Sequence, residues 1–369
     1  LQIQSNHIQM SYYFMFVILF FVGAYFEDAY RKKELPHFFK ASGVLALAAV
    51  VGVCINISNL YHTYEYSKET MRGKSELKQE GAAASQTSSG LDRDYITNWS
   101  YGIGETLTLL VPNVKGGGSG STMSQSEAAM AKANPMYNGI YSQLPQYFGE
   151  QPWTAGPVYV GAFVMFLFVL GCFIVKGPLK WALLGATIFS ILLSWGKNFM
   201  GLTDFFIDYV PMYNKFRAVS SILVIAEFTI PLLAIFALKE ILSKPDMLKQ
   251  EKNCRGVIAA LVLTAGVAFI LAVAPGAFFS SFITAQEMTA LKQALPAEHL
   301  APFVANLTEM REAIIASDAW RSFFIIVIGC LFLFLYQLRK LKASFTLAGI
   351  ALLCLIDMWS VNKRYLNDE

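Results

Sequence analysis

Eight stretches of roughly 20 mainly apolar residues constrain this chain more than any other feature of its sequence. A helix of that length crosses the hydrocarbon core of a lipid bilayer. The composition agrees, because only 15% of the residues are charged, against about 25% in soluble domains. We therefore predict an all-α, polytopic transmembrane helix bundle. The predicted spans are approximately 11–26, 41–57, 157–175, 180–196, 216–242, 255–279, 320–338 and 341–361.

The short connections between the predicted spans are basic. They are YRKKELPHFFK, KGPLK, KEILSKPDMLKQEKNCR and QLRKLK, at residues 30–40, 176–180, 239–255 and 337–342. Basic connections face the cytoplasm in most polytopic membrane proteins. All four fall on one side of the membrane if the eight spans are correct, so the longer, less basic connections are predicted to lie outside.

This topology divides the chain into five segments. Residues 1–57 form transmembrane helices 1–2, and 58–156 form a large outer loop. Residues 157–279 form transmembrane helices 3–6, 280–319 form a helical outer loop, and 320–369 form transmembrane helices 7–8.

The two large outer loops show helical periodicity. Apolar residues recur at steps of three and four in both, which predicts amphipathic helices lying in the membrane interface. They are Ile96, Trp99, Ile103, Leu107 and Leu110 in the first loop, and Leu300, Phe303, Val304, Leu307 and Ile314 in the second. Two Gly/Ser-rich stretches of the first loop, 74–90 and 115–126, are predicted to be mobile.

Several functional classes find no support. The sequence has no P-loop, no G-x-G-x-x-G followed by a helix, no G-x-S-x-G and no H-E-x-x-H. A net charge of +3 without a basic stripe argues against a nucleic-acid partner. The five cysteines are spread singly, which is typical of small core residues rather than of a disulfide framework or a zinc site.

The segment 210–231, VPMYNKFRAVSSILVIAEFTIP, holds the most informative charges. Lys215 and Arg217 precede a span on the predicted outer side, where the charge bias of loops does not explain them. A phosphate at the membrane surface suits them, because a guanidinium group offers paired donors. The alternative is that these cations snorkel, or pair with Asp204 and Asp208 nearby.

Glu227 lies about 15 Å of helix rise beyond Arg217, roughly halfway across a bilayer. An ionised acid at that depth costs several kcal/mol unless it is paired, hydrated or protonated. Ser220 lies on nearly the same helix face, and Pro231, which lacks an N–H, is predicted to kink the helix. Two interpretations stay open for Glu227. It lines a polar cavity or proton site inside the bundle, or it is a structural acid hydrogen-bonded to a neighbouring helix.

Acids and aromatic residues also occur in the first outer loop. Asp92 and Asp94 have the D-x-D spacing with which two carboxylates share a divalent cation that holds a diphosphate. The alternative is that the two acids lie at a helix N-terminus, where the helix dipole stabilises negatively charged side chains. Flat rings beside carboxylates suit a sugar ring or a membrane interface. The further candidates of this kind are Glu65, Glu105, Trp99 and Tyr101.

Five longer blocks resemble the YfhO-type membrane proteins of the Bacteroidetes group, and the similarity runs through essentially the whole chain. The blocks are LQIQSNHIQMSYYF, NISNLYHTYEYSKETMRGKSEL, SSGLDRDYITNWSYGIGETLTLLVPNVKGG, GEQPWTAGPVYVGAFV and YVPMYNKFRAVSSILVIAEFTIPLLA. That family is similar to the GT-C glycosyltransferases. These polytopic enzymes transfer a sugar from a polyprenyl-phosphate donor at the outer membrane face.

The resemblance implies a bacterial inner membrane with the large loops in the periplasm. It implies a polyprenyl-phosphate sugar donor, a glycan or envelope-polymer acceptor, and Lys215 and Arg217 as the residues that hold the lipid phosphate. In GT-C enzymes the catalytic acid usually lies near the start of the protein. The first residues here match the middle of the family, so no catalytic residue is assigned.

Two other functions stay open. One is a transporter or flippase of envelope intermediates with Glu227 as coupling acid, although we find one proline-interrupted span and no repeated half. The other is a non-catalytic membrane scaffold whose outer loops bind partners. Membrane lipid is an expected partner in every case, and a divalent cation is the one cofactor considered.

Overall fold

The computed structural model describes residues 3–4, 7–70 and 90–366 of the chain. These residues are mainly helical, and the β-pairing among them is one isolated bridge between Thr122 and Pro145. The chain forms two compact units. Unit 1 contains Leu1–Tyr101 and Lys176–Thr229, and unit 2 contains Gly102–Val175 and Ile230–Glu369.

Unit 1 begins with a helical hairpin. Helices α1 (Ile8–Lys32) and α2 (Leu35–Ile55) are joined at Lys33, which adopts a left-handed conformation with φ of 60°. Helix α8 (Pro178–Ser194) packs along α1 through aromatic side chains such as Phe16, Phe20 and Phe189. The remaining early helices of unit 1 are α3 (Ile57–Lys68) and the short α4 (Arg93–Thr97).

Helix α8 ends in a sharp bend. The segment Gly196–Tyr209, which contains η4 (Gly196–Phe199) and α9 (Met200–Tyr209), makes an angle of 108° with α8. Gly196 has a φ of 47°, and a Cβ atom there would lie 2.1 Å from the Ser100 hydroxyl. Glycine is therefore required at the bend by both conformation and space.

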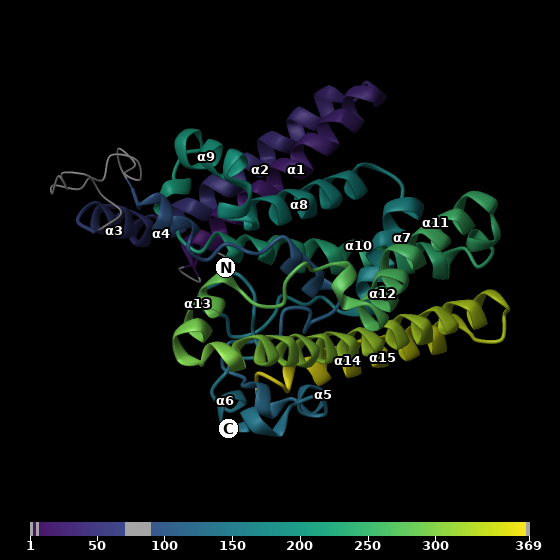
Figure 1. Ribbon diagram of the computed structural model, residues 1–369. Coiled ribbons are helices and arrows are strands. Elements are labelled where there is room, and N and C mark those ends of the chain that lie inside the picture. The colour runs from purple at the N-terminus through teal and green to yellow at the C-terminus, as the bar shows by residue number, and fades with distance from the viewer. Residues whose placement is uncertain (1–2, 5–6, 71–89, 367–369) are drawn as a thin grey trace. The chain divides into compact units, whose positions relative to one another are not determined.

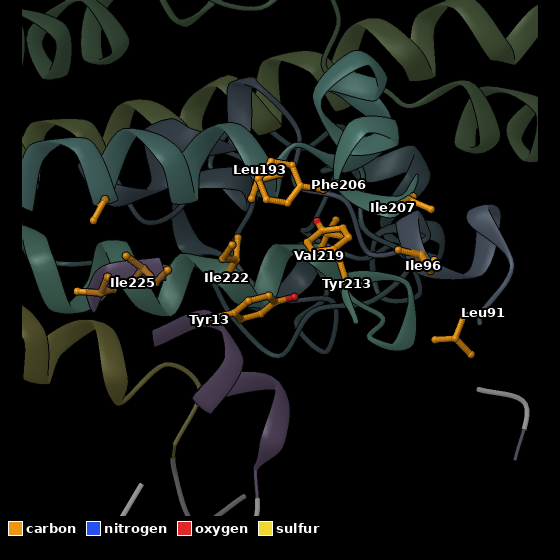
Figure 2. Close-up of a cluster of buried hydrophobic side chains, with 12 residues drawn as sticks. Tyr13, Leu91, Ile96, Leu193, Phe206, Ile207, Tyr213, Val219, Ile222 and Ile225 are labelled. Atoms are coloured by element: carbon orange, nitrogen blue, oxygen red, sulfur yellow. The ribbon is translucent and has the colours of Figure 1, made fainter. Parts of the chain in front are cut away.

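A buried apolar cluster holds unit 1 together. Figure 2 shows Tyr13 of α1, Phe206 of α9, and Tyr213 and Ile222 of the following segment gathered in this cluster. That segment contains η5 (Tyr213–Lys215) and η6 (Val219–Leu223) and leads into α10 (Val224–Ser243), whose later residues belong to unit 2. The cluster therefore fixes the residues on both sides of Lys215 and Arg217.

Unit 2 is built around a long helix. Helix α14 (Ala297–Gln337) has 41 residues, which is about 60 Å of rise and far more than a bilayer needs. Figure 1 shows α15 (Ala343–Asn362) beside it. The other main elements are η1 (Gly104–Leu109), α5 (Glu127–Met130), α6 (Asn138–Tyr141), α7 (Ala162–Ile174), α11 (Glu251–Leu261), the π-helical η8 (Val262–Gly266), α12 (Val267–Val273) and α13 (Ala285–Ala294).

The predicted all-α polytopic bundle is confirmed. Among the described residues, six helices are long and apolar enough to cross a membrane, or seven if α8 and its bent continuation form one span. Each predicted span falls on a helix. The exception to the predicted length is α7, whose 13 residues are short for a complete crossing.

The amphipathic helix predicted over residues 96–110 is wrong. Helix α4 ends at Thr97, and the next helical element, the 3₁₀-helix η1, begins only at Gly104. The backbone between them bonds elsewhere: Tyr101 N donates to Ser194 O at 2.8 Å, and Gly102 N donates to the Glu105 carboxylate at 2.7 Å. These partners outcompete helical hydrogen bonds, which the apolar spacing alone does not reveal.

The predicted mobility of residues 115–126 is also wrong. Gly116, Gly117 and Gly118 are buried, and the first two have φ of 83° and 78°. A Cβ atom would lie 1.9 Å from Gln146 O at Gly116 and 2.3 Å from the Tyr365 hydroxyl at Gly117. The glycines permit close backbone packing rather than flexibility. The other stretch predicted to be mobile, 74–90, lies outside the described residues apart from Gly90.

The apolar face predicted in the second outer loop is confirmed. Phe303, Leu307 and Ile314 are buried in one cluster with Tyr137 and Tyr141. However, this face is not a separate helix, because α14 continues through it into the predicted span 320–338.

Candidate functional site

The residues Met212–Ala218 form a loop between α9 and η6 that we call the cation loop, since it holds Lys215 and Arg217. Met212 and Ala218, which bound it, have left-handed φ values of 66° and 58°. Such a conformation costs a residue with a Cβ atom about 1–2 kcal/mol. Strained backbone persists where the surrounding structure enforces it, and it is concentrated at functional sites.

Hydrogen bonds from three other segments hold the backbone of this loop and of η6, which follows it. Leu91 N donates to Asn214 O at 3.0 Å, and Ser220 N donates to Trp99 O at 3.1 Å. The side-chain amide of Gln9 donates to Arg217 O at 2.7 Å. Gly90, with φ of 116°, lets the chain approach, because a Cβ there would lie 2.7 Å from Asn214 O. The loop is thus fixed although its charged side chains are not buried.

Arg217 is exposed and packs on aromatic residues. Its Nη1 donates to the Tyr95 hydroxyl at 2.6 Å, and its guanidinium carbon lies 5.6 Å from the Tyr95 ring centroid and 6.0 Å from that of Trp99. Within the described part of the chain, Arg217 forms no ion pair with a carboxylate. The guanidinium is therefore oriented by π-faces, which leave most of its donors available to an anion.

The acids that were the alternative partners of Lys215 and Arg217 are bound by another residue. Arg93 of α4 donates to Asp208 at 2.6 Å and also contacts Asp204, both on α9. These ion pairs join α4 to α9.

Burial changes the pKa of two groups in the loop. Burial lowers the pKa of the Lys215 ammonium group. Burial also raises the pKa of Tyr213 well above its ordinary value. The Tyr213 hydroxyl has no hydrogen-bond partner within residues 3–4, 7–70 and 90–366. A buried donor without an acceptor is costly. The Tyr213 hydroxyl is therefore a group beneath the loop that can still form a hydrogen bond.

The D-x-D pair serves the helix terminus in the structure. Asp92 caps α4, with its carboxylate accepting from Asp94 N at 2.9 Å, and Asp94 is exposed. The described residues contain no group of three metal-ligating side chains. Glu65 lies on α3, where it pairs with Lys68 at 2.8 Å. These acids are not gathered around a common point by any contact of the described residues.

Trp99, Tyr101 and Glu105 are separated by the break between α4 and η1. Trp99 flanks Arg217, whereas Tyr101 is buried with its carbonyl accepting from Asn198. Glu105 belongs to unit 2 and is buried, accepting from Gly102 N, Glu150 N and the Tyr147 hydroxyl at 2.7, 3.1 and 2.6 Å. Three hydrogen bonds from the protein itself therefore hold its carboxylate.

Glu227 lies on the exposed surface of α10. It forms no hydrogen bond or ion pair within the described residues, so the interhelical hydrogen bond that was considered is not observed among them. Ser220 is tied to Trp99 through its backbone N–H. The helix continues through Pro231 as far as Ser243. The role of Glu227 stays a prediction.

Sequence reasoning missed two groups of buried charges in unit 2. Arg311 is fully buried and pairs with both oxygens of Glu287 at 2.7 Å. Asp318 pairs with Arg364 and Arg321, and Arg321 also bonds to Asp357. A signal was present, since Arg311 falls four residues after Leu307 on the predicted apolar face. Asp357, similarly, is an acid inside a predicted span.

Lys115 is a third ionic feature that sequence reasoning did not single out. Its ammonium lies 4.9 Å from the Phe148 ring centroid and 4.2 Å from that of Phe279. Burial lowers the pKa of this amine, and Glu105 and Glu150 oppose that effect. No hydrogen bond or ion pair of its amine is found among the residues described.

Comparisons with protein-family models, with curated proteins and with solved structures found no match. Function is therefore argued from the chain itself. The cation loop is the strongest candidate site, because it joins an enforced strained backbone, an aromatic support and an exposed cation without an acidic partner in the described residues.

Proposed function

We propose that this protein is a cell-envelope glycosyltransferase similar to the GT-C enzymes, and that its cation loop binds the phosphate of a polyprenyl-phosphate-linked sugar. One observation supports this most. Arg217 is held on Tyr95 and Trp99 with no carboxylate partner in the described residues, while Arg93 takes both nearby acids. A cation kept free of acids at the start of a span suits the phosphate of a lipid.

The chemistry follows from the leaving group. Polyprenyl phosphate departs with its negative charge, and cations beside it stabilise that charge as it develops. Lys215 and Arg217 would supply those cations, with Arg217 pre-oriented by its hydrogen bond to Tyr95. A carboxylate would deprotonate the acceptor hydroxyl, and we assign that role to no residue of this chain.

The setting we propose is the outer face of a bacterial inner membrane, with a glycan or envelope polymer as acceptor. The apolar helices support contact with membrane lipid. The orientation rests on the basic short connections, which favour a cytoplasmic location for the opposite ends of the helices.

The test is transfer from a polyprenyl-phosphate sugar by the protein in lipid nanodiscs. A hydrogen bond to a charged group contributes about 1.5–3 kcal/mol, so Lys215→Ala and Arg217→Ala should each weaken donor binding roughly 10–100-fold, and the double variant should abolish transfer. Arg255→Ala is the matched control, because this arginine is exposed and its one ion pair among the described residues is with Glu251 on its own helix. Unchanged transfer in the double variant would exclude the phosphate role.

The same variants separate the alternatives. A proton-coupled transporter would lose uptake into proteoliposomes in Glu227→Gln and keep it in Lys215→Ala. A scaffold would show no donor binding in any variant. The exposed position of Glu227, without a partner among the described residues, gives the transporter no specific structural support.

A further inference from the structure

Helix α9 leaves a predicted membrane span nearly at a right angle. The segment that contains it makes an angle of 108° with α8, and Gly196 forms the corner. If α8 crosses the bilayer, α9 runs close to the plane of the membrane surface. It has ten residues and lies at the end of α8 that is predicted to be outside.

The three sides of α9 are chemically distinct. Thr203, Phe206 and Ile207 are buried against unit 1. On the opposite side, Phe205 and Tyr209 are four residues apart, so they lie on one face, and they are 52% and 75% exposed. Their rings contact each other at 5.5 Å between centroids.

Two further exposed apolar residues flank the helix in the chain. Phe199 precedes α9 and is 42% exposed, and Met212 follows it and is 51% exposed. We call Phe199, Phe205, Tyr209 and Met212 the aromatic stripe. Four large exposed side chains so close together in the chain are unusual for a protein surface in water. Aromatic residues are, however, enriched where membrane proteins meet the lipid headgroups.

The acidic side chains of α9 are paired within the protein. Asp204 and Asp208 lie beside the stripe and both bind Arg93 of α4. The acids are thus neutralised by the protein rather than presented as free anions to lipid headgroups. A helix with one packed side, one paired acidic side and one exposed aromatic side fits the interface of a bilayer.

We propose that the aromatic stripe of α9 binds the lipid interface, and that it sets the depth of the cation loop. Met212 is both the last residue of the stripe and the first of the loop. Anchoring it among the headgroups places Lys215 and Arg217 at the level of lipid phosphates. This proposal concerns the lipid contact of α9 and does not depend on any sugar chemistry.

The depth of α9 is measurable without an activity assay. In a variant whose five native cysteines are replaced by serine, Phe205→Cys would be labelled with a fluorophore in phosphatidylcholine and phosphatidylglycerol nanodiscs. Nitroxide lipids labelled near the headgroup should quench this probe several-fold more than a probe at Asp94→Cys, an exposed position of α4. Iodide in the water should show the opposite order.

Two results would overturn the proposal. Equal quenching of both probes by iodide would mean that the stripe faces water. Protection of the Phe205→Cys probe from both quenchers would mean that a protein partner covers it. Tyr209→Cys provides a second position on the stripe if the first variant folds poorly. Since no readout uses a sugar donor, loss of the glycosyltransferase proposal would leave this result intact.

Discussion

Arg217 in unit 1 and Arg311 in unit 2 have the same functional group in opposite surroundings. Arg311 is fully buried, with two hydrogen bonds to Glu287 and one to Phe282 O. Arg217 is exposed and rests on two aromatic residues, without an acidic partner in the described chain. The fold neutralises the buried arginine with a carboxylate, whereas it supports the exposed one with aromatic rings.

This difference separates ionic groups that build the protein from those that can bind. A buried charge must be paired, because an unpaired one carries a large desolvation cost. The unit 2 network follows that rule: Asp318, Arg321, Asp357 and Arg364 bond mainly to one another. The cation loop instead retains strain at Met212 and Ala218, and Arg217 has no acidic partner among the described residues.

Replacing Arg311 by leucine should have the largest effect on stability. The change leaves the Glu287 carboxylate, only 15% exposed, without its partner. Removing one member of a buried pair costs about 3–5 kcal/mol, measurable by thermal unfolding in detergent. Arg255→Leu, which removes an exposed pair with Glu251, should cost no more than about 1 kcal/mol. Similar losses of stability in the two variants would show that the buried and the exposed ion pair contribute equally to the free energy of unfolding.

Gly116→Ala should destabilise unit 2 by about 2–3 kcal/mol, from left-handed strain and overpacking. The added Cβ would meet Gln146 O at 1.9 Å. The glycine segment is also linked to the buried ion pairs of Asp318. Tyr365 packs at Gly117 and its hydroxyl donates to the Asn113 side chain, and the backbone N–H of Asn113 donates to Asp318. Gly120→Ala is the control, since nothing lies within 4 Å of its added Cβ. Equal stability of both variants would revive the prediction that this stretch is mobile.

The sequence predicted the helices well because apolar length is a local property. Every predicted span lies on a helix, and the apolar face from Leu300 to Ile314 is buried. The failures involve distant partners. Glycines 116–118 have the composition of a flexible linker, yet they contact Gln146 and Tyr365.

The candidate site was predictable only in part. Lys215 and Arg217 stand out by their position before a span, so the sequence was sufficient to select them. Their aromatic support was not predicted, because Tyr95 lies 122 positions earlier in the chain. Nor was it possible to predict that Arg93 takes Asp204 and Asp208, since charge and proximity in sequence favoured Lys215 and Arg217 as partners.

Ala218→Gly tests the strain in the cation loop. Glycine removes the left-handed strain of about 1–2 kcal/mol but loses about 0.5–1 kcal/mol of chain entropy. A stabilisation of about 0.5–1 kcal/mol is therefore expected, together with weaker donor binding as the loop becomes less fixed. Gly201→Ala, an open helical position on α9, should change stability without changing binding. Tighter binding in Ala218→Gly would show that the strain opposes the site rather than shaping it.

The smallest effect concerns Lys115, which resembles Arg217 in lying on aromatic rings but differs in being half-buried. Burial lowers the pKa of its amine below the ordinary value of 10.5. Between the lowered pKa and the ordinary one, the unfolded chain binds a proton that the folded protein does not. This group therefore adds stability as pH rises through that window, and the added stability is absent below it. Unfolding of the native chain and of Lys115→Met, compared at about pH 8 and about pH 10, should show a smaller rise in the variant. An identical change in both proteins would mean that Lys115 is as well solvated as Arg217, and the contrast between the two cations would disappear.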